Sequence, residues 1–205
     1  MLFTSEQVSA GHPDKICDQI ADAIVTDCLR HDRDSRVAVE CMIKDCMILI
    51  AGEITSKHAP DYEILCREVL RRVGDPDPEA YVVNSLVTCQ SRDIAMGVDR
   101  GGAGDQGLMF GYATNETPEL LPLPFAVATR ALELLRDRHS PLLLPDAKSQ
   151  VTFDYCSRRI HTFLISTQHR AYAGQRDIYE LVRSVMDDVA DAYGLNHDFR
   201  ALVNP

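Results

Sequence analysis

The sequence lacks several features that would assign it to a special class of protein. It contains no tryptophan, and no CxxC pair that would indicate a zinc ribbon or a thioredoxin-like motif. No apolar run approaches the ~18 residues of a membrane span. Basic residues are scarce, because 21 Lys and Arg stand against 31 Asp and Glu and give a net charge of −10. This balance argues against general nucleic-acid or acidic-membrane binding, which requires a basic surface. A polyphosphate ligand would need a local basic pocket and metal ions.

The seven cysteines do not indicate a disulfide framework. Their number is odd, and Cys17, Cys28, Cys41 and Cys66 lie in apolar-periodic segments, where cysteine acts as a small hydrophobe. We expect a reducing compartment, without disulfides or a zinc site. The first six residues contain neither a basic region nor an apolar core, so we expect no secretory signal and a cytoplasmic protein.

Hydrophobic periodicity predicts an α+β fold built from two β-α-β-β-α-β repeat units. In the first unit, strands are expected at 2–9, 36–43, 47–55 and 81–88, and helices at 14–30 and 60–73. In the second, strands are expected at 107–113, 149–155, 159–166 and 199–203, and helices at 123–138 and 175–193. Such units form mostly antiparallel or mixed sheets with helices on one face. The predicted division is 1–88, a glycine-rich mobile loop at 89–107, and 108–205.

The stretch Gly11-His12-Pro13-Asp14-Lys15 carries the strongest chemical signal. It places an imidazole, a carboxylate and an ammonium where an extended segment turns into a helix. A helix N-terminus offers free N–H donors and partial positive charge to a phosphate. Lys15 adds a full charge, and Asp14 offers an oxygen ligand for Mg2+. On these five residues alone, an ordinary helix start with Pro13 in its first turn explains the pattern equally well.

Three further segments are weaker candidates. The hexad Gly102-Ala103-Gly104-Asp105-Gln106-Gly107 permits close approach of a ligand to the backbone, or is a flexible connector. Asp146-Ala147-Lys148, at the entrance of a predicted strand, suits a phosphate or adenine-bearing ligand, or is an exposed ion pair. Glu40 and Glu53 lie in apolar strands, where a buried carboxylate needs a cationic partner and a solvent-facing one does not.

Together, these segments resemble the S-adenosylmethionine synthetases (methionine adenosyltransferases). The resemblance covers essentially the whole chain. It rests on the segments FTSEQVSAGHPDKICDQIADA from Phe3, GEIT from Gly52, GVDR from Gly97, GAGDQGLMFGYATNET from Gly102, LLPDAKSQVTF from Leu143, and STQH from Ser166. The resemblance implies a reaction in which the methionine sulfur attacks C5′ of ATP and displaces triphosphate, which is then hydrolysed to phosphate and pyrophosphate. It also implies Mg2+ and K+ as cofactors.

The resemblance assigns roles to individual positions. On the phosphate side, His12, Lys15 and Lys148 are implied catalytic residues and Asp14 is an implied Mg2+ ligand. His12, Asp105, Asp146, Ala147 and Lys148 are implied ATP contacts. Glu53, Gln90 and Asp105 are implied methionine contacts, with Glu53 pairing with the amino group, and Glu40 is an implied K+ ligand. The segment from Gln90 to Gly102 resembles a gate that would exclude water.

The sequence also departs from the family pattern. Ala10 stands where the family usually has glutamate, and Asp99-Arg100 meets Gly101-Gly102 where the family loop is longer. Family members have three repeat units, and this chain matches the first two. The third unit normally supplies another Mg2+ ligand and several basic phosphate contacts.

The leading hypothesis is therefore a catalytic chain in a homo- or hetero-oligomer that forms through the sheet faces, with the third unit supplied by a second polypeptide. The alternatives are a non-catalytic or regulatory subunit and a truncated form of a three-unit enzyme.

Overall fold

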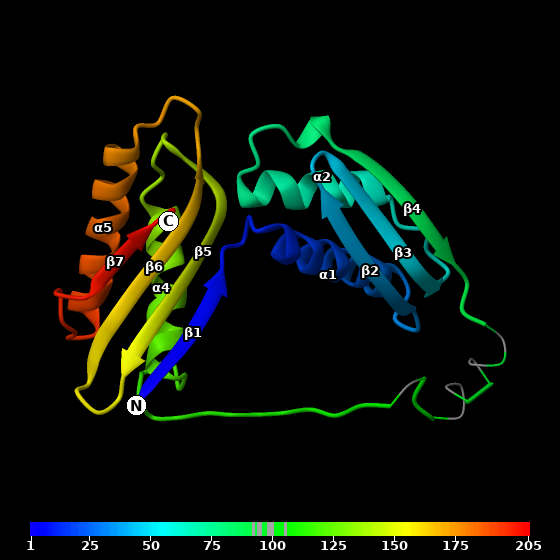
Figure 1. The fold of residues 1–205 in the computed structure, drawn as a ribbon. Coiled ribbons are helices and arrows are strands. Elements are labelled where there is room, and N and C mark those ends of the chain that lie inside the picture. Colours follow the sequence, from blue (N-terminus) through cyan, green and yellow to red (C-terminus); the bar gives the residue numbers. More distant parts are fainter. Residues whose placement is uncertain (92, 94–95, 98–100, 105) are drawn as a thin grey trace. The chain divides into compact units, whose positions relative to one another are not determined.

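The computed structural model describes residues 1–91, 93, 96–97, 101–104 and 106–205, and within these it forms two mixed sheets and four α-helices (Figure 1). The predicted α+β class is confirmed. The chain divides into two compact units, Pro13–Gly111 and Met1–His12 with Tyr112–Pro205. In each unit two helices cover one face of the sheet, as the periodicity predicts. Among the described residues, no helix combines the length and apolar character that a membrane crossing requires.

The three-stranded unit contains α1 (Pro13–His31), β2 (Arg36–Lys44), β3 (Met47–Thr55), α2 (Tyr62–Val73) and β4 (Val82–Thr88). Strand β3 is central, antiparallel to β2 and parallel to β4. The predicted stripe on α1 is fully or almost fully buried at Ile16, Ile20 and Ile24, and it packs with the alternate residues Ile48 and Ile50 of β3. The helical and strand periods thus direct their apolar residues into one core.

The ends of α2 follow from two short-range signals. The Asp61 side chain accepts a hydrogen bond from the Ile64 amide at 3.0 Å, so Asp61 is the N-cap and the helix begins at Tyr62 rather than at Pro60. At the other end, Gly74 adopts the left-handed conformation with φ of 85° and donates its amide to the Arg71 carbonyl. A residue with a Cβ is strained in this conformation, which explains why the helix stops at glycine.

The four-stranded unit contains β1 (Leu2–Val8), α4 (Leu123–Asp137), β5 (Leu143–Asp154), β6 (Arg159–His169), α5 (Gln175–Ala192) and β7 (Arg200–Val203). The strand order is β1-β5-β6-β7, with antiparallel pairs except for the parallel pair β6–β7. The core lies between the sheet and helices α4 and α5, and its largest fully buried side chain is Phe163.

Strand β5 begins six residues before its predicted start at 149. Its pairing with β6 is irregular between Leu143 and Ala147, where Pro145 lies. Proline has no backbone N–H to donate to a ladder, so it is tolerated at such an irregularity. Asp146, Ala147 and Lys148 consequently lie inside the strand and not at its entrance.

The spatial grouping differs from the predicted division into 1–88, 89–107 and 108–205. Strand β1 pairs with β5 along its whole length, from Leu2 opposite Asp154 to Val8 opposite Lys148, so the N-terminal segment belongs to the sheet of the second repeat. The hydrophobic pattern of the sequence cannot show this pairing, because the alternation of apolar and polar residues identifies a strand but not the strand beside it.

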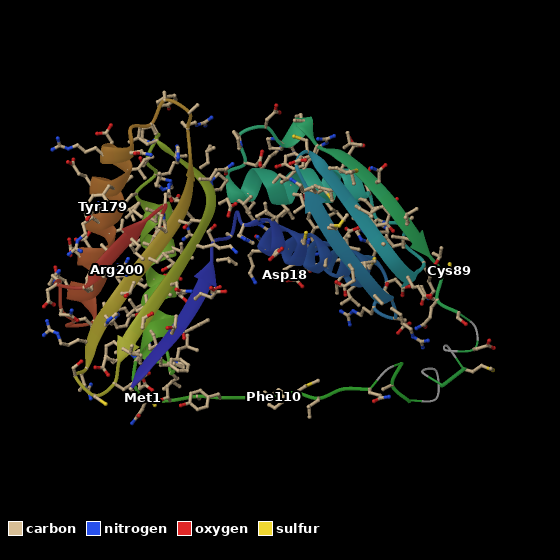
Figure 2. All side chains as sticks on the ribbon, viewed as in Figure 1. Met1, Asp18, Cys89, Phe110, Tyr179 and Arg200 are labelled. Atoms are coloured by element: carbon tan, nitrogen blue, oxygen red, sulfur yellow. The ribbon has the colours of Figure 1, made fainter. Side chains whose placement is uncertain are left out.

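The prediction of a strand at 107–113 is wrong. These residues lack regular structure, and Leu108, Met109 and Phe110 expose 81%, 93% and 91% of their surface. Figure 2 shows Phe110 on an extended segment. A strand needs a hydrogen-bonded neighbour, and the described part of this chain provides none for these residues.

Candidate functional site

The turn at the end of β1 is fixed to β5 by the side chain of Ser9. Its Oγ donates to the Pro145 carbonyl at 2.7 Å and accepts from the Ala147 amide at 2.8 Å. The Ser9 amide donates to the Ala147 carbonyl at 2.8 Å. These three bonds join the Gly11-His12 segment to the Asp146–Lys148 segment inside the four-stranded unit. Two stretches with separate chemical signals in the sequence thus lie together in the fold.

Gly11 allows these two segments to approach closely. A Cβ at this position would lie 2.4 Å from the Cβ of Pro145 and 2.6 Å from its carbonyl carbon and oxygen. The next residue, His12, is 8% exposed, and its amide donates to the Ser9 carbonyl at 3.1 Å. The glycine is therefore required by packing against β5, and His12 is held by the same turn.

Asp146 and Lys148 line a cavity of about 420 Å³ in the four-stranded unit. Its other lining residues are Ser166, Thr167, Gln168, Asn204 and Pro205. Lys148 is exposed and makes no ion pair with the residues that the structure describes. An ammonium beside a cavity of this size is suited to an anionic group such as a phosphate.

Asn204 forms one wall of this cavity and was not identified from the sequence. Its side-chain oxygen accepts from the Thr167 amide at 2.7 Å, and its side-chain nitrogen donates to the Thr167 carbonyl at 3.1 Å. These bonds connect Asn204, the residue after β7, to β6 and fix the backbone of Thr167, which lines the cavity with its neighbours Ser166 and Gln168. Ser9 was likewise missed, because the sequence shows no signal for a hydrogen bond to a residue more than 130 positions away.

Asp14 and Lys15 lie in the first turn of α1, in the three-stranded unit. The carboxylate of Asp14 is at the positive end of the helix dipole. Lys15 is half-buried, and its Nζ lies 2.8 Å from Oδ2 of Asp18, which Figure 2 labels on the same helix. An anionic ligand would have to compete with this solvent-accessible ion pair, in which the side chains of Lys15 and Asp18 are 43% and 63% exposed and whose contribution is small.

Glu40 and Glu53 share the face of the three-stranded sheet opposite its helices. Glu40 is opposite Ala51 and Glu53 is opposite Ala38, so the two carboxylates are diagonal neighbours on β2 and β3. Glu40 is exposed and Glu53 is partly buried. Two like charges at this spacing repel each other, and a cation or an ammonium group nearby reduces the repulsion.

Gln90 lies two residues after Thr88, the last residue of β4. Glu53 is aligned with Thr88 in the parallel pair β3–β4, so Glu53 and Gln90 lie at the same end of the sheet. The side-chain Oε1 of Gln90 is buried and accepts no hydrogen bond from the described residues. A buried oxygen without a donor costs about 1–3 kcal/mol, so this atom can gain from a ligand N–H.

Two thiols join the helix that carries Asp14 to the strand that carries Glu40. The interaction between the Cys17 and Cys41 thiols lowers the pKa of Cys17 and raises the pKa of Cys41. Burial raises the pKa of the nearby Cys66 thiol to about 12. These cysteines therefore act as packing residues between α1, β2 and α2, and all seven cysteines of the chain are free thiols.

The carboxylates at positions 14, 40 and 53 offer oxygen ligands for the implied cations. Asp14 is an exposed carboxylate, and Mg2+ is typically held by one or two carboxylates together with substrate phosphates. Glu40 offers an exposed carboxylate beside a second one at Glu53. Both donor sets fit hard cations. Asp105, the remaining predicted contact, lies outside the described residues.

Comparison with known families assigns both halves of the chain. Residues 1–92 match the model of the S-adenosylmethionine synthetase N-terminal domain, and residues 100–205 match that of the central domain. The S-adenosylmethionine synthase of Mesoplasma florum is 43% identical over 223 aligned residues, which cover all of this chain and 59% of the relative. That of Salinibacter ruber is 47% identical over 204 residues, which cover 90% of this chain and 53% of the relative. The chain thus spans just over half the length of these relatives.

Proposed function

Since the chain belongs to the S-adenosylmethionine synthetase family, we propose that it binds ATP and L-methionine for the synthesis of S-adenosylmethionine. The observation that carries this proposal is the junction of the Gly11-His12 turn with Asp146–Lys148 through Ser9. This junction brings the segment that carries His12 beside the segment that carries Asp146 and Lys148, at one corner of the four-stranded unit. Such a corner suits the adenine and phosphate groups of ATP.

The proposed reaction is a displacement at carbon. A lone pair of the methionine sulfur forms a bond to C5′ of the ribose, and the C5′–O bond to the triphosphate breaks. The sulfur becomes a sulfonium cation, and water then cleaves the triphosphate to phosphate and pyrophosphate. A thioether has no proton to lose, so the sulfur needs no general base. The main requirement is to stabilise the highly anionic leaving group.

The residues of the four-stranded unit serve the nucleotide in this proposal. His12 donates a hydrogen bond to the triphosphate, Lys148 pairs with a phosphate, and Asp146 and Ala147 position the nucleoside. The backbone of His12 is fixed by the hydrogen bond of its amide to the Ser9 carbonyl, and its side chain is 8% exposed. Donors that are fixed before the reaction reduce the reorganisation needed as negative charge develops.

The residues of the three-stranded unit serve methionine and the cations. Glu53 pairs with the methionine ammonium, and Gln90 accepts one of its N–H groups through the buried Oε1. Asp14 would bind Mg2+, Lys15 would pair with a phosphate group, and Glu40 would bind K+. Mg2+, when bound, neutralises charge on the phosphates.

We further propose that a second polypeptide supplies the family's third unit and with it the remaining basic phosphate contacts. The net charge of −10 supports this, because few basic groups remain in this chain to take over that role. The chain with ATP, methionine, Mg2+ and K+ should form little S-adenosylmethionine alone, and product formation should rise when a separately expressed third unit is added. Robust synthesis by the chain alone would contradict the need for a partner.

Lys148→Ala tests the nucleotide site directly. Its affinity for Mg-ATP, measured by calorimetry, should fall by about 10- to 150-fold, because one phosphate loses a charge-assisted bond worth roughly 1.5–3 kcal/mol. Lys44→Ala is the matched control, since Lys44 is an exposed lysine paired with Asp45 at the β2–β3 turn. Equal ATP affinity in the two variants would contradict the assignment of Lys148.

His12→Ala separates a catalytic chain from a regulatory one. In the reconstituted mixture, loss of synthesis supports a chain that acts on the triphosphate. An unchanged rate would instead support a non-catalytic subunit that binds and modulates a complete synthetase.

A further inference from the structure

Three side chains with metal-binding atoms cluster in the three-stranded unit, away from every residue given a role above. Asp27 and His31 are four positions apart on α1, so they lie on the same side of the helix. His58 comes from the connection between β3 and α2. Each residue places one ligand atom within 4.8 Å of the ligand atoms of the other two.

The proposed ligand atoms are joined by direct contacts, and Nδ1 of His31 also lies 2.9 Å from the backbone carbonyl of Asp27. Nε2 of His58 lies 2.7 Å from Oδ2 of Asp27, and Nδ1 of His31 lies 3.5 Å from Oδ1 of Asp27. The two imidazole rings stack with their centroids 4.0 Å apart. Bonds of about 2.1 Å around a tetrahedral ion put neighbouring ligand atoms about 3.4 Å apart. A bound ion would therefore replace the hydrogen bond between His58 and Asp27 and move these two ligand atoms apart by somewhat less than an ångström.

We propose that Asp27, His31 and His58 bind a divalent first-row transition-metal ion of the Zn2+ type. Two imidazoles and one carboxylate suit Zn2+, Ni2+ or Cu2+, whereas Mg2+ and K+ take oxygen ligands. Three protein ligands leave a fourth position of a tetrahedral ion for water. This site is independent of the proposed synthesis of S-adenosylmethionine and of the cations assigned to it.

Hydrogen bonds hold the loop of His58 against the end of α1. The Lys57 amide donates to Oδ2 of Asp32 at 2.9 Å, and the hydroxyls of Ser35 and Ser56 lie 2.8 Å apart. The His58 amide donates to Oγ of Ser56 at 3.0 Å. The third ligand is therefore brought to α1 by contacts that do not involve its ring. Such supporting bonds orient the ligands of metal sites.

A groove between α1 and α2 provides room for the water ligand. Its volume is about 710 Å³, and both Asp27 and His58 line it. It also contains the carboxylates Asp22, Asp61 and Glu68, together with Arg30 and Arg72. Acidic surroundings in a chain of net charge −10 favour the approach of a cation.

The same contacts also describe a metal-free ion pair, in which Asp27 simply attaches the loop of His58 to α1. Zn2+ titration of the complete chain, followed by nuclear magnetic resonance of the histidine rings, distinguishes the two. Binding at the proposed site should shift the ring nitrogens of His31 and His58 together, at one ion per chain, and leave those of His161 unchanged. If the rings of His31 and His58 do not respond to excess Zn2+, the proposal is overturned.

Variants test whether the three residues act together. His31→Ala and His58→Ala should each lower the Zn2+ affinity, measured by competition with a chromophoric chelator, by at least about tenfold. His161→Ala, at an exposed position on β6, should bind Zn2+ like the unmodified chain. Zn2+ should also raise the melting temperature of the unmodified chain and not that of His31→Ala, because the ion binds only the folded site. Equal affinities in all variants would place the bound Zn2+ elsewhere, for example on the exposed cysteines, and refute the site.

Discussion

Replacing Gly11 with alanine would place a methyl group against the backbone and ring of Pro145. The added Cβ would meet three Pro145 atoms at 2.4 to 2.6 Å, whereas ordinary contacts begin near 3.4 Å. The obstacle is a proline ring and a carbonyl group, neither of which can rotate away as a long side chain would. The turn after β1 and the irregular start of β5 would therefore have to separate by about an ångström.

Overpacking of this kind typically costs about 1–3 kcal/mol. For a chain of this size, each kcal/mol lowers the melting temperature by about 2–4 °C. Gly11→Ala should therefore melt about 2–12 °C below the unmodified chain in a thermal scan and lose a matching free energy of unfolding in urea. Because Asp146, Ala147 and Lys148 are the three residues after Pro145, the affinity for Mg-ATP should fall as well.

Gly111→Ala is the matched control. Its Cβ would meet nothing within 4 Å, and the backbone there is in an ordinary conformation. Its stability should stay within about 0.5 kcal/mol of the unmodified chain. If Gly11→Ala melts together with Gly111→Ala, the close packing of the Gly11 turn on β5 is incorrect.

Three further changes probe individual interactions. Ser9→Ala should lower the free energy of unfolding by about 1–3 kcal/mol in urea titrations, because it leaves the amide of the buried Ala147 without its acceptor. Gln90→Met should leave that free energy unchanged or higher, since it removes a buried oxygen that no described residue donates to, and should weaken methionine binding in calorimetry; unaltered binding would contradict the role of Gln90. Hydrogen bonding to Asp187 raises the pKa of His197. This stabilisation is complete below the ordinary histidine pKa and is lost as pH rises through the folded value. The free energy of unfolding of His197→Gln should therefore fall furthest below that of the unmodified chain at pH values below the ordinary histidine pKa. The difference should shrink as the pH rises through the folded pKa of His197, in urea titrations at several pH values.

Local chemistry made most helices and strands predictable. The apolar spacing of Ile16, Ile20 and Ile24 identifies α1 and its buried face, and the structure confirms both. The boundary of α2 was missed by two residues, because Asp61 was not recognised as the cap. Fold class and helix placement thus depend on patterns within about ten residues, which a single sequence displays directly.

The partners of the strands were not predictable from such patterns. The short apolar run at 107–113 resembles a strand, yet a strand forms only beside another strand. The junction of Gly11 with Pro145 depends on the same missing information, since no local signal links two turns so far apart. The motifs of the candidate site were found separately, and only the pairing of β1 with β5 shows which of them meet.

The pairing of β1 with β5 also has a consequence for folding during synthesis. Thr4 and Thr152 face each other although they are 148 positions apart in the sequence. Strand β1, which is synthesised first, therefore cannot pair until β5 has been synthesised. At about 5–20 residues per second, the ribosome needs roughly 7–30 s to close this gap. By then, residues Pro13–Gly111 have all three strands of their own sheet, so this unit can fold first. During this interval β1 has no strand partner, and its unpaired backbone N–H and C=O groups are open to pairing with another chain.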